Sequence, residues 1–184
     1  SGRLTAFFRI LDDIAARREK VVVFVQHFDV QDVVARAIRA RYGLDHMPGK
    51  INGTMPPAAR QRVVTEFQDG RPGFDAVVLT GRAAGTGLTL TAANHVVHLE
   101  RWWNPAVEDQ CSDRVYRIGQ TKDVMVHVPL AVFREEVDPA DSPFDVTLHQ
   151  FLERKRSRSQ SVLAPSSGKG DQEFIESFFG KKAD

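Results

Sequence analysis

Short, fully apolar runs that alternate with helical patterns are the feature that most constrains the fold of this chain. The clearest is VVVFV at residues 21–25, which follows a helical repeat of apolar residues between Leu4 and Ile14. Comparable runs lie at residues 76–79, 96–99 and 124–128, and further helical patterns lie at residues 29–41 and 56–67, before Gly43 and Gly70. Strands that are apolar on both faces are typical of parallel sheets. The sequence therefore predicts an α/β fold in which helices cover both faces of a parallel sheet.

The chain is predicted to contain one domain and a tail. Its 184 residues, 42% of them hydrophobic, are enough for one domain with a sizeable core. A helical pattern through Leu148 and Leu152 gives way to the basic run RKRSRSQ and then to a linker-like stretch rich in Pro, Ser and Gly. We therefore expect a domain over residues 1–159 and a flexible linker with a short amphipathic tail over residues 160–184. Residues 134–144 are expected to form an exposed loop.

Composition excludes several kinds of site. The formal net charge is +1, so any nucleic-acid binding must come from a local basic surface. The single cysteine, Cys111, excludes an intrachain disulfide and a multi-cysteine zinc cluster, which fits a reducing compartment. His95 and His98 lie three residues apart in a predicted strand and point to opposite faces, so we expect no metal site. No apolar run is long enough to span a bilayer, and we expect no membrane partner.

Two arginines in the segment QCSDRVYRIGQ form the most distinctive candidate site. Asn104 can cap a helix whose first turn suits Pro105. On that helix Gln110, Arg114 and Arg117 would fall at i, i+4 and i+7 and share one face. A fixed pair of guanidinium groups can stabilise the charge that develops on a transferring phosphoryl group. The alternative is a helix with a solvated basic face.

Three further candidates lie at or after predicted strand ends. Gly85 and Gly87 would let the backbone approach a nucleotide, and an ordinary glycine turn is the alternative. Gly53 and Thr54 offer a backbone amide and a hydroxyl for a phosphate contact, although a turn before a helix would use the same residues. Arg60, on the next predicted helix, could reach a DNA phosphate or be solvated.

Three blocks of sequence, in order, resemble the second RecA-like lobe of Swi/Snf-type DNA translocases, in the second helicase superfamily. They are KVVVFVQHFD at residues 20–29, INGTMPPAARQRVVTEF at residues 51–67, and the long block from LTGRAAGTGL to RIGQTKDV at residues 79–124. The long block is the most specific, because many ordered positions match. The resemblance implies a RecA-like parallel sheet with helices on both faces, followed by a helical and flexible C-terminal tail.

The resemblance also implies a role for each candidate residue. Arg114 and Arg117 would be the catalytic arginines that act on the phosphates of ATP. The residues implied to contact ATP are Gly85, Gly87 and Gln110. The residues implied to contact DNA are Gly53, Thr54, Arg60 and Arg82. Trp103 is implied to couple nucleotide state to movement along DNA, and the alternative for both Trp102 and Trp103 is an aromatic of the core or of a lobe interface.

The implied partners follow from what the sequence lacks. It contains no GxxxxGK[ST] phosphate-binding loop and no Asp-Glu-x-His motif. ATP and Mg²⁺ would then be held mainly by a first RecA-like lobe of the same polypeptide, and this chain would be half of a motor, inactive in isolation. The motor would move along double-stranded DNA and remodel protein–DNA complexes, in the cytoplasm or nucleoid of a bacterium or in a eukaryotic nucleus.

Two other functions remain open at this point. The chain could be a non-catalytic nucleic-acid-binding or scaffold module with the same fold, or a lobe of an RNA helicase. The paired arginines argue against a scaffold. The RWWNP block favours the Swi/Snf branch over RNA helicases.

Overall fold

The computed structural model describes residues 2–84, 87–132 and 144–160, and for residues 82, 84 and 158–160 it describes the backbone alone. The chain divides into two compact units, Ser1–Val132 and Phe133–Asp184. The predicted tail beyond residue 160 and all but the last residue of the predicted loop at 134–144 lie outside the described residues. The domain boundary near residue 159 therefore stays a prediction.

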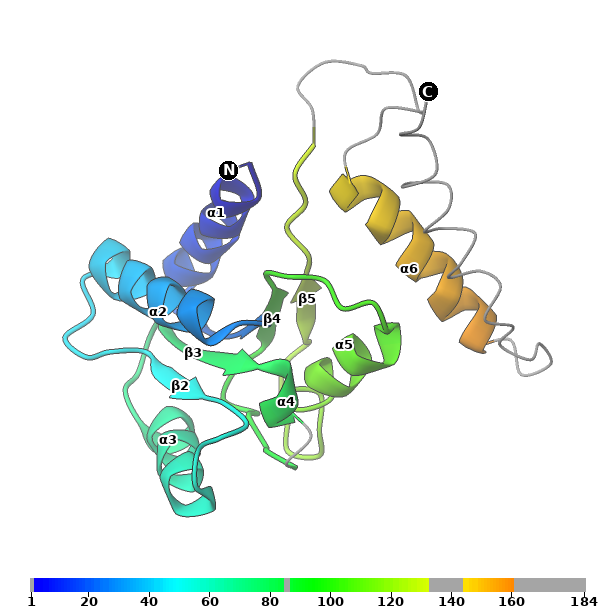
Figure 1. Cartoon of the computed structure of the whole chain (residues 1–184). Helices are drawn as coiled ribbons and strands as arrows, with labels where there is room; N and C mark the ends of the chain where they lie inside the picture. Colours follow the sequence, from blue (N-terminus) through cyan, green and yellow to red (C-terminus); the bar gives the residue numbers. More distant parts are fainter. Residues whose placement is uncertain (1, 85–86, 133–143, 161–184) are drawn as a thin grey trace. The chain divides into compact units, whose positions relative to one another are not determined.

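Parallel strands and helices alternate along the first unit (Figure 1). The strands are β1 (Lys20–Val25), β2 (Gly49–Ile51), β3 (Asp75–Thr80), β4 (His95–His98) and β5 (Met125–His127). The helices are α1 (Gly2–Ala16), α2 (Phe28–Tyr42), α3 (Pro57–Asp69), α4 (Gly81–Ala84) and α5 (Pro105–Ser112). The described part of the second unit is one helix, α6 (Phe144–Gln160). Every strand pair is parallel and the order is β2-β3-β1-β4-β5, which confirms the predicted α/β sheet.

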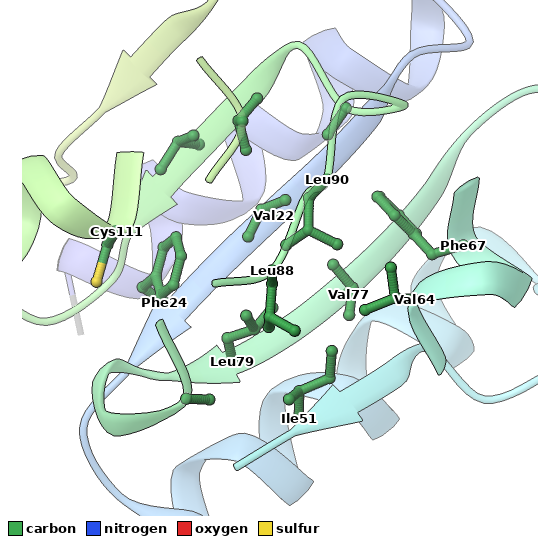
Figure 2. Close-up of a cluster of buried hydrophobic side chains, with 14 residues drawn as sticks. Val22, Phe24, Ile51, Val64, Phe67, Val77, Leu79, Leu88, Leu90 and Cys111 are labelled. Atoms are coloured by element: carbon green, nitrogen blue, oxygen red, sulfur yellow. The ribbon is translucent and has the colours of Figure 1, made fainter. Parts of the chain in front are cut away.

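The side chains of β1 alternate between two buried clusters, one on each face of the sheet. Val21, Val23 and Val25 join a cluster with α1 and α2. Val22 and Phe24 point the other way, into a cluster with α3, α5 and the chain that precedes β4. Figure 2 shows this second cluster. Because both faces of the strand are covered, apolar residues are needed at every position, which is why the run VVVFV carries no polar side chain.

Glycines end two of the helices, as the sequence predicts. Gly43 adopts a left-handed conformation, with φ of 61°, and its backbone N–H donates to the carbonyl of Arg39. Gly70 ends α3, and a Cβ atom at this position would lie 1.9 Å from the carbonyl oxygen of Glu66. Any larger residue would therefore require the end of α3 to move.

The buried side of α3 differs in part from the prediction. The sequence pattern favours Ala59, Val63 and Phe67 as the buried stripe, whereas Val64 and Phe67 are the buried residues of this helix. Val63 and Ala59 are half-buried. Figure 2 shows Val64 and Phe67 beside Val77 of β3, so the contact line on α3 runs at i and i+3 rather than i and i+4.

The parallel arrangement brings the carboxyl ends of β1 to β4 to one edge of the sheet, where α/β proteins commonly bind ligands. None of the helices in the described ranges has the length and apolar character needed to cross a lipid bilayer.

Candidate functional site

The carboxyl edge of the sheet gathers most of the predicted site residues. Gly53 and Thr54 follow β2. Arg82 lies in α4, directly after β3, and Gly87 follows the same helix. Trp103 follows β4. The residues predicted to bind DNA and nucleotide are far apart in the sequence, but they lie at neighbouring strand ends. A single ligand-binding edge requires this arrangement.

The start of α5 is built as the sequence predicts. Asn104 is the N-cap, and its Oδ1 accepts a hydrogen bond of 3.1 Å from the backbone N of Ala106. Pro105 occupies the first turn, where its missing N–H is not needed. Gln110 lies on this helix with an exposed side chain.

The prediction that Gln110, Arg114 and Arg117 share one face of a helix is wrong. Helix α5 ends at Ser112, and the segment at residues 113–119, here called the arginine turn, consists of turns and bends. The physical reason is a long-range contact: the carbonyl of Arg114 accepts a hydrogen bond of 2.9 Å from the backbone N of Leu90. Val115 is fully buried in the core at the same place. Packing against a distant loop therefore replaces the next helical turn.

Arg117 is anchored on the chain that leads from α4 toward β4. Its Nη1 atom donates to the carbonyls of Gly87 at 3.1 Å and Leu88 at 3.3 Å, and to Oγ1 of Thr89 at 3.1 Å. Its side chain is exposed, and its Nε and Nη2 atoms make no hydrogen bond to the described residues. Two predicted residues, Gly87 and Arg117, are thus brought together, while Gly85 lies outside the described residues.

Arg114 has a different environment from Arg117. Its side chain is half-buried, and its Nε atom is buried without a hydrogen-bond partner in the described residues. A buried nitrogen of a charged group that lacks a partner carries a desolvation cost. An anion that reached this nitrogen would remove part of that cost.

Arg60 and Thr54 are partly engaged in their own turn. Nη2 of Arg60 donates to the carbonyl of Met55 at 3.0 Å, and its Nε is buried without a partner in the described residues. The backbone N and Oγ1 of Thr54 donate to Oδ1 of Asn52 at 3.2 Å and 2.9 Å. Gly53 and Thr54 are exposed. The turn before α3 is therefore held in shape by its own side chains.

The two tryptophans differ in their surroundings. Trp103 is 51% exposed, which excludes a core role for this residue. Trp102 is half-buried, and a Cβ atom on Gly81 would lie only 2.3 Å from Cζ2 of its ring. The ring of Trp102 therefore packs directly on the backbone at the start of α4.

A buried ion pair at the start of α5 is one feature that sequence reasoning missed. Nε and Nη2 of Arg101 donate to the two carboxylate oxygens of Glu108 at 2.8 Å and 2.9 Å. The backbone N of Trp102 also donates to Glu108 Oε1, at 3.0 Å. Arg101 is 8% exposed and Glu108 is 2% exposed. The sequence signal that could have indicated this ion pair is the placement of Arg101 and Glu108, with opposite charges, on either side of the N-cap residue Asn104.

Gln120 makes a second set of contacts that the sequence did not predict. Its Nε2 atom donates to the carbonyls of Thr91 at 3.2 Å and Ala93 at 2.7 Å. It follows Gly119, whose φ is 100°. The side chain therefore fastens the end of the arginine turn to the chain before β4. The positive φ demanded by the turn explains the glycine that precedes Gln120.

The histidines and the cysteine have structural surroundings. His95 Nε2 lies 2.7 Å from Glu19 Oε2, and the hydrogen bond between them lowers the pKa of Glu19 to about 2. His98 Nε2 lies 3.0 Å from the hydroxyl of Ser112. Burial raises the pKa of the Cys111 thiol to about 12, so it stays protonated near neutral pH. Within the described ranges no three His, Cys, Asp or Glu side chains come together to hold a metal ion.

Residues 4–119 match the family model of the helicase conserved C-terminal domain. The chain is 35% identical over 180 residues to the Zorya protein ZorD of Escherichia coli O139:H28, which covers 95% of this chain and 16% of ZorD. It is also 36% identical to the ATP-dependent helicase ULS1 of Saccharomyces cerevisiae, in an alignment of 119 residues that covers 65% of this chain and 7% of ULS1.

A solved structure has the same fold. The Sulfolobus solfataricus SWI2/SNF2 ATPase core in complex with dsDNA matches with a TM-score of 0.69 and 29% sequence identity, over 96% of this chain and 35% of that one. This chain therefore spans only a fraction of the proteins that it matches. The sequence motifs, the parallel sheet and these comparisons agree: the chain belongs to the helicase conserved C-terminal domain family and corresponds to the C-terminal, RecA-like lobe of SWI2/SNF2 ATPases.

Proposed function

We propose that this lobe belongs to a motor that uses ATP to move along double-stranded DNA and to remodel protein–DNA complexes. The observation that carries the proposal is the geometry of Arg117. One terminal nitrogen, Nη1, is anchored on residues 87–89, while Nε and Nη2 of this exposed side chain make no hydrogen bond to the described residues. The edge formed by Nε and Nη2 is one that binds two phosphate oxygens at once. An anchored guanidinium with a free edge is suited to an arginine finger.

Arg114, Gln110 and the glycines at 85 and 87 complete the proposed nucleotide side of the lobe. The buried Nε of Arg114, without a partner in the described residues, supports a role for an anion there. ATP supplies a phosphoryl group whose charge is redistributed over its oxygens during transfer. Helicase-family ATPases use ATP with Mg²⁺, and the described residues offer no cluster of carboxylates for the metal. We assign the main binding of both to a first RecA-like lobe of the same polypeptide.

The proposed DNA track uses Gly53, Thr54, Arg60 and Arg82. Its support is the position of all four after β2 and β3, at the carboxyl edge of the sheet, and the SWI2/SNF2 relative whose structure contains dsDNA. Exposed backbone and hydroxyl groups of a turn, together with arginines, suit phosphate contacts that do not depend on base sequence. We therefore place the protein where DNA is, in a bacterial nucleoid or cytoplasm or in a eukaryotic nucleus.

The purified chain is expected to hydrolyse ATP negligibly, with or without duplex DNA, because the arginines act on a nucleotide that another lobe holds. Steady-state phosphate release is the measurement, with the Arg117→Ala chain as the control for contaminating ATPases. Turnover by the wild-type chain that rises with DNA and disappears in the Arg117→Ala chain would contradict the division into two lobes.

Trp103→Ala in the full-length protein is expected to uncouple ATP turnover from movement. The side chain is half exposed, and a surface substitution changes the free energy of unfolding by at most about 0.5 kcal/mol. Thermal melting and ATP turnover should therefore persist, while displacement of a third strand from duplex DNA should be lost. Parallel loss of all three on one preparation would show that Trp103 serves stability instead.

A further inference from the structure

Helix α4 and the start of α5 meet through the ring of Trp102. A Cβ atom at Gly81, the first residue of α4, would lie 2.3 Å from Cζ2 and 2.4 Å from Cη2 of this ring. Real Cβ atoms do not approach other heavy atoms so closely, so glycine alone permits the contact. Helix α4 also contacts α5 (Figure 1). A displacement of α4 toward this ring therefore cannot occur without moving the tryptophan.

The backbone around Trp102 is tied to α5. Its N–H donates to Glu108 Oε1 at 3.0 Å, and Glu108 lies in the middle of α5. The same carboxylate binds the guanidinium of Arg101 through two hydrogen bonds. Because Arg101 and Glu108 are both buried, solvent does not compete for these bonds. Trp102 is thus connected to the helix that leads into the arginine turn.

The residues before Trp102, Glu100 and Arg101, are hydrogen-bonded to Gln26, which directly follows β1. Nε2 of Gln26 donates to the carbonyl of Arg101 at 2.6 Å, and the backbone N of Gln26 donates to Oε2 of Glu100 at 2.5 Å. These bonds hold the residues before Trp102 at the end of the central strand. The backbone of Trp102 is therefore fixed to β1 and α5, and its ring packs on the start of α4.

We propose that Trp102 is a positioning residue that transmits displacement of α4, the helix that carries Arg82, to α5 and the arginine turn. The inference rests on the proposed function, in which α4 follows DNA and the arginine turn meets ATP. The route is a contiguous set of packed and hydrogen-bonded groups: Gly81, Trp102, Glu108 and α5.

The test compares Gly81→Ala, Trp102→Phe and the double variant in the full-length protein. Alanine suits a helix, so the added methyl group acts mainly by pushing the ring of Trp102 away. We expect Gly81→Ala to reduce the stimulation of ATP turnover by DNA about tenfold, the scale of a coupling residue. Phenylalanine lacks the two ring atoms that collide, and Nε1 of Trp102 makes no hydrogen bond to the described residues. Trp102→Phe alone should therefore lose the contact with α4 and also reduce the stimulation, and the double variant, whose added methyl group fills part of the vacated space, should regain most of it.

Turnover without DNA and the melting temperature separate positioning from simple packing. Val33→Ala, at a position 61% exposed on α2, is the control and should behave as wild type. If Gly81→Ala retains DNA stimulation, or if the double variant fails to regain it, the inference is wrong. A fall in melting temperature and basal turnover with unchanged stimulation would overturn it as well. Failure of the proposed function gives a different result: the ATP turnover of the wild-type protein would not respond to DNA.

Discussion

Arg117→Ala is expected to reduce the DNA-stimulated ATP turnover of the full-length protein by about 10³-fold, the scale of an arginine finger. The substitution removes the guanidinium and, with it, the anchor on residues 87–89. Arg117→Lys should rescue little, because one ammonium group cannot hold the anchor and offer two parallel hydrogen bonds to a phosphate. Affinity for duplex DNA should change little in either variant.

Arg114→Ala is expected to reduce DNA-stimulated ATP turnover on the same scale, without a loss of thermal stability. The half-buried guanidinium has a nitrogen without a partner in the described residues, so its removal should not weaken the folded chain through a lost hydrogen bond. The measurements are steady-state turnover, duplex binding and thermal melting. Arg36→Ala, an exposed arginine on α2, is the matched control. Turnover that survives both Arg114→Ala and Arg117→Ala would mean that the arginine turn is structural.

Glu108→Ala is expected to lower the free energy of unfolding by about 3 to 5 kcal/mol, because it leaves a buried guanidinium without its carboxylate. The backbone N–H of Trp102 loses its acceptor at the same time. Replacing both partners, as Arg101→Met with Glu108→Leu, should cost less than Glu108→Ala alone, since no charge then stays buried. Chemical denaturation of the chain measures the free energy of unfolding of both variants and of the wild type.

The control for Glu108→Ala is an ion pair of similar geometry at the surface. Arg41 Nη2 lies 2.7 Å from Asp12 Oδ2, and the two side chains are 47% and 43% exposed. Asp12→Ala should change the free energy of unfolding much less than Glu108→Ala, because water screens an exposed pair. Equal effects of the two substitutions would show that burial of the Arg101–Glu108 pair does not change its contribution to the free energy of unfolding.

The sheet could be predicted from the sequence because its pattern is local. A strand covered on both faces must be apolar throughout, so residues 21–25 and 76–79 identify themselves as strands without knowledge of their neighbours. Helix ends are equally local: Asn104 caps α5 through its own side chain, and Gly43 ends α2 through its own backbone. These features depend on residues a few positions apart.

The arginine site could not be predicted in the same way. A helical continuation is locally acceptable for Arg114 and Arg117, and a bond from Leu90 together with burial of Val115 overrides it. Gln120 likewise acts on carbonyls far from it in sequence. The residue types could be chosen from the sequence, but their orientation depends on tertiary contacts that no local pattern encodes.

Because residues 87–93 hold the arginine turn, we expect the proposed phosphate contacts to depend on the packing of these two segments. A peptide that contained only residues 104–120 would carry both arginines yet lack the carbonyl groups that bind Arg117 and the Leu90 amide that binds the carbonyl of Arg114. Local opening of residues 87–93, with the sheet still intact, would release Arg117 from its anchor. Hydrogen exchange at the amide of Leu90, which donates to Arg114, would report that opening separately from global unfolding.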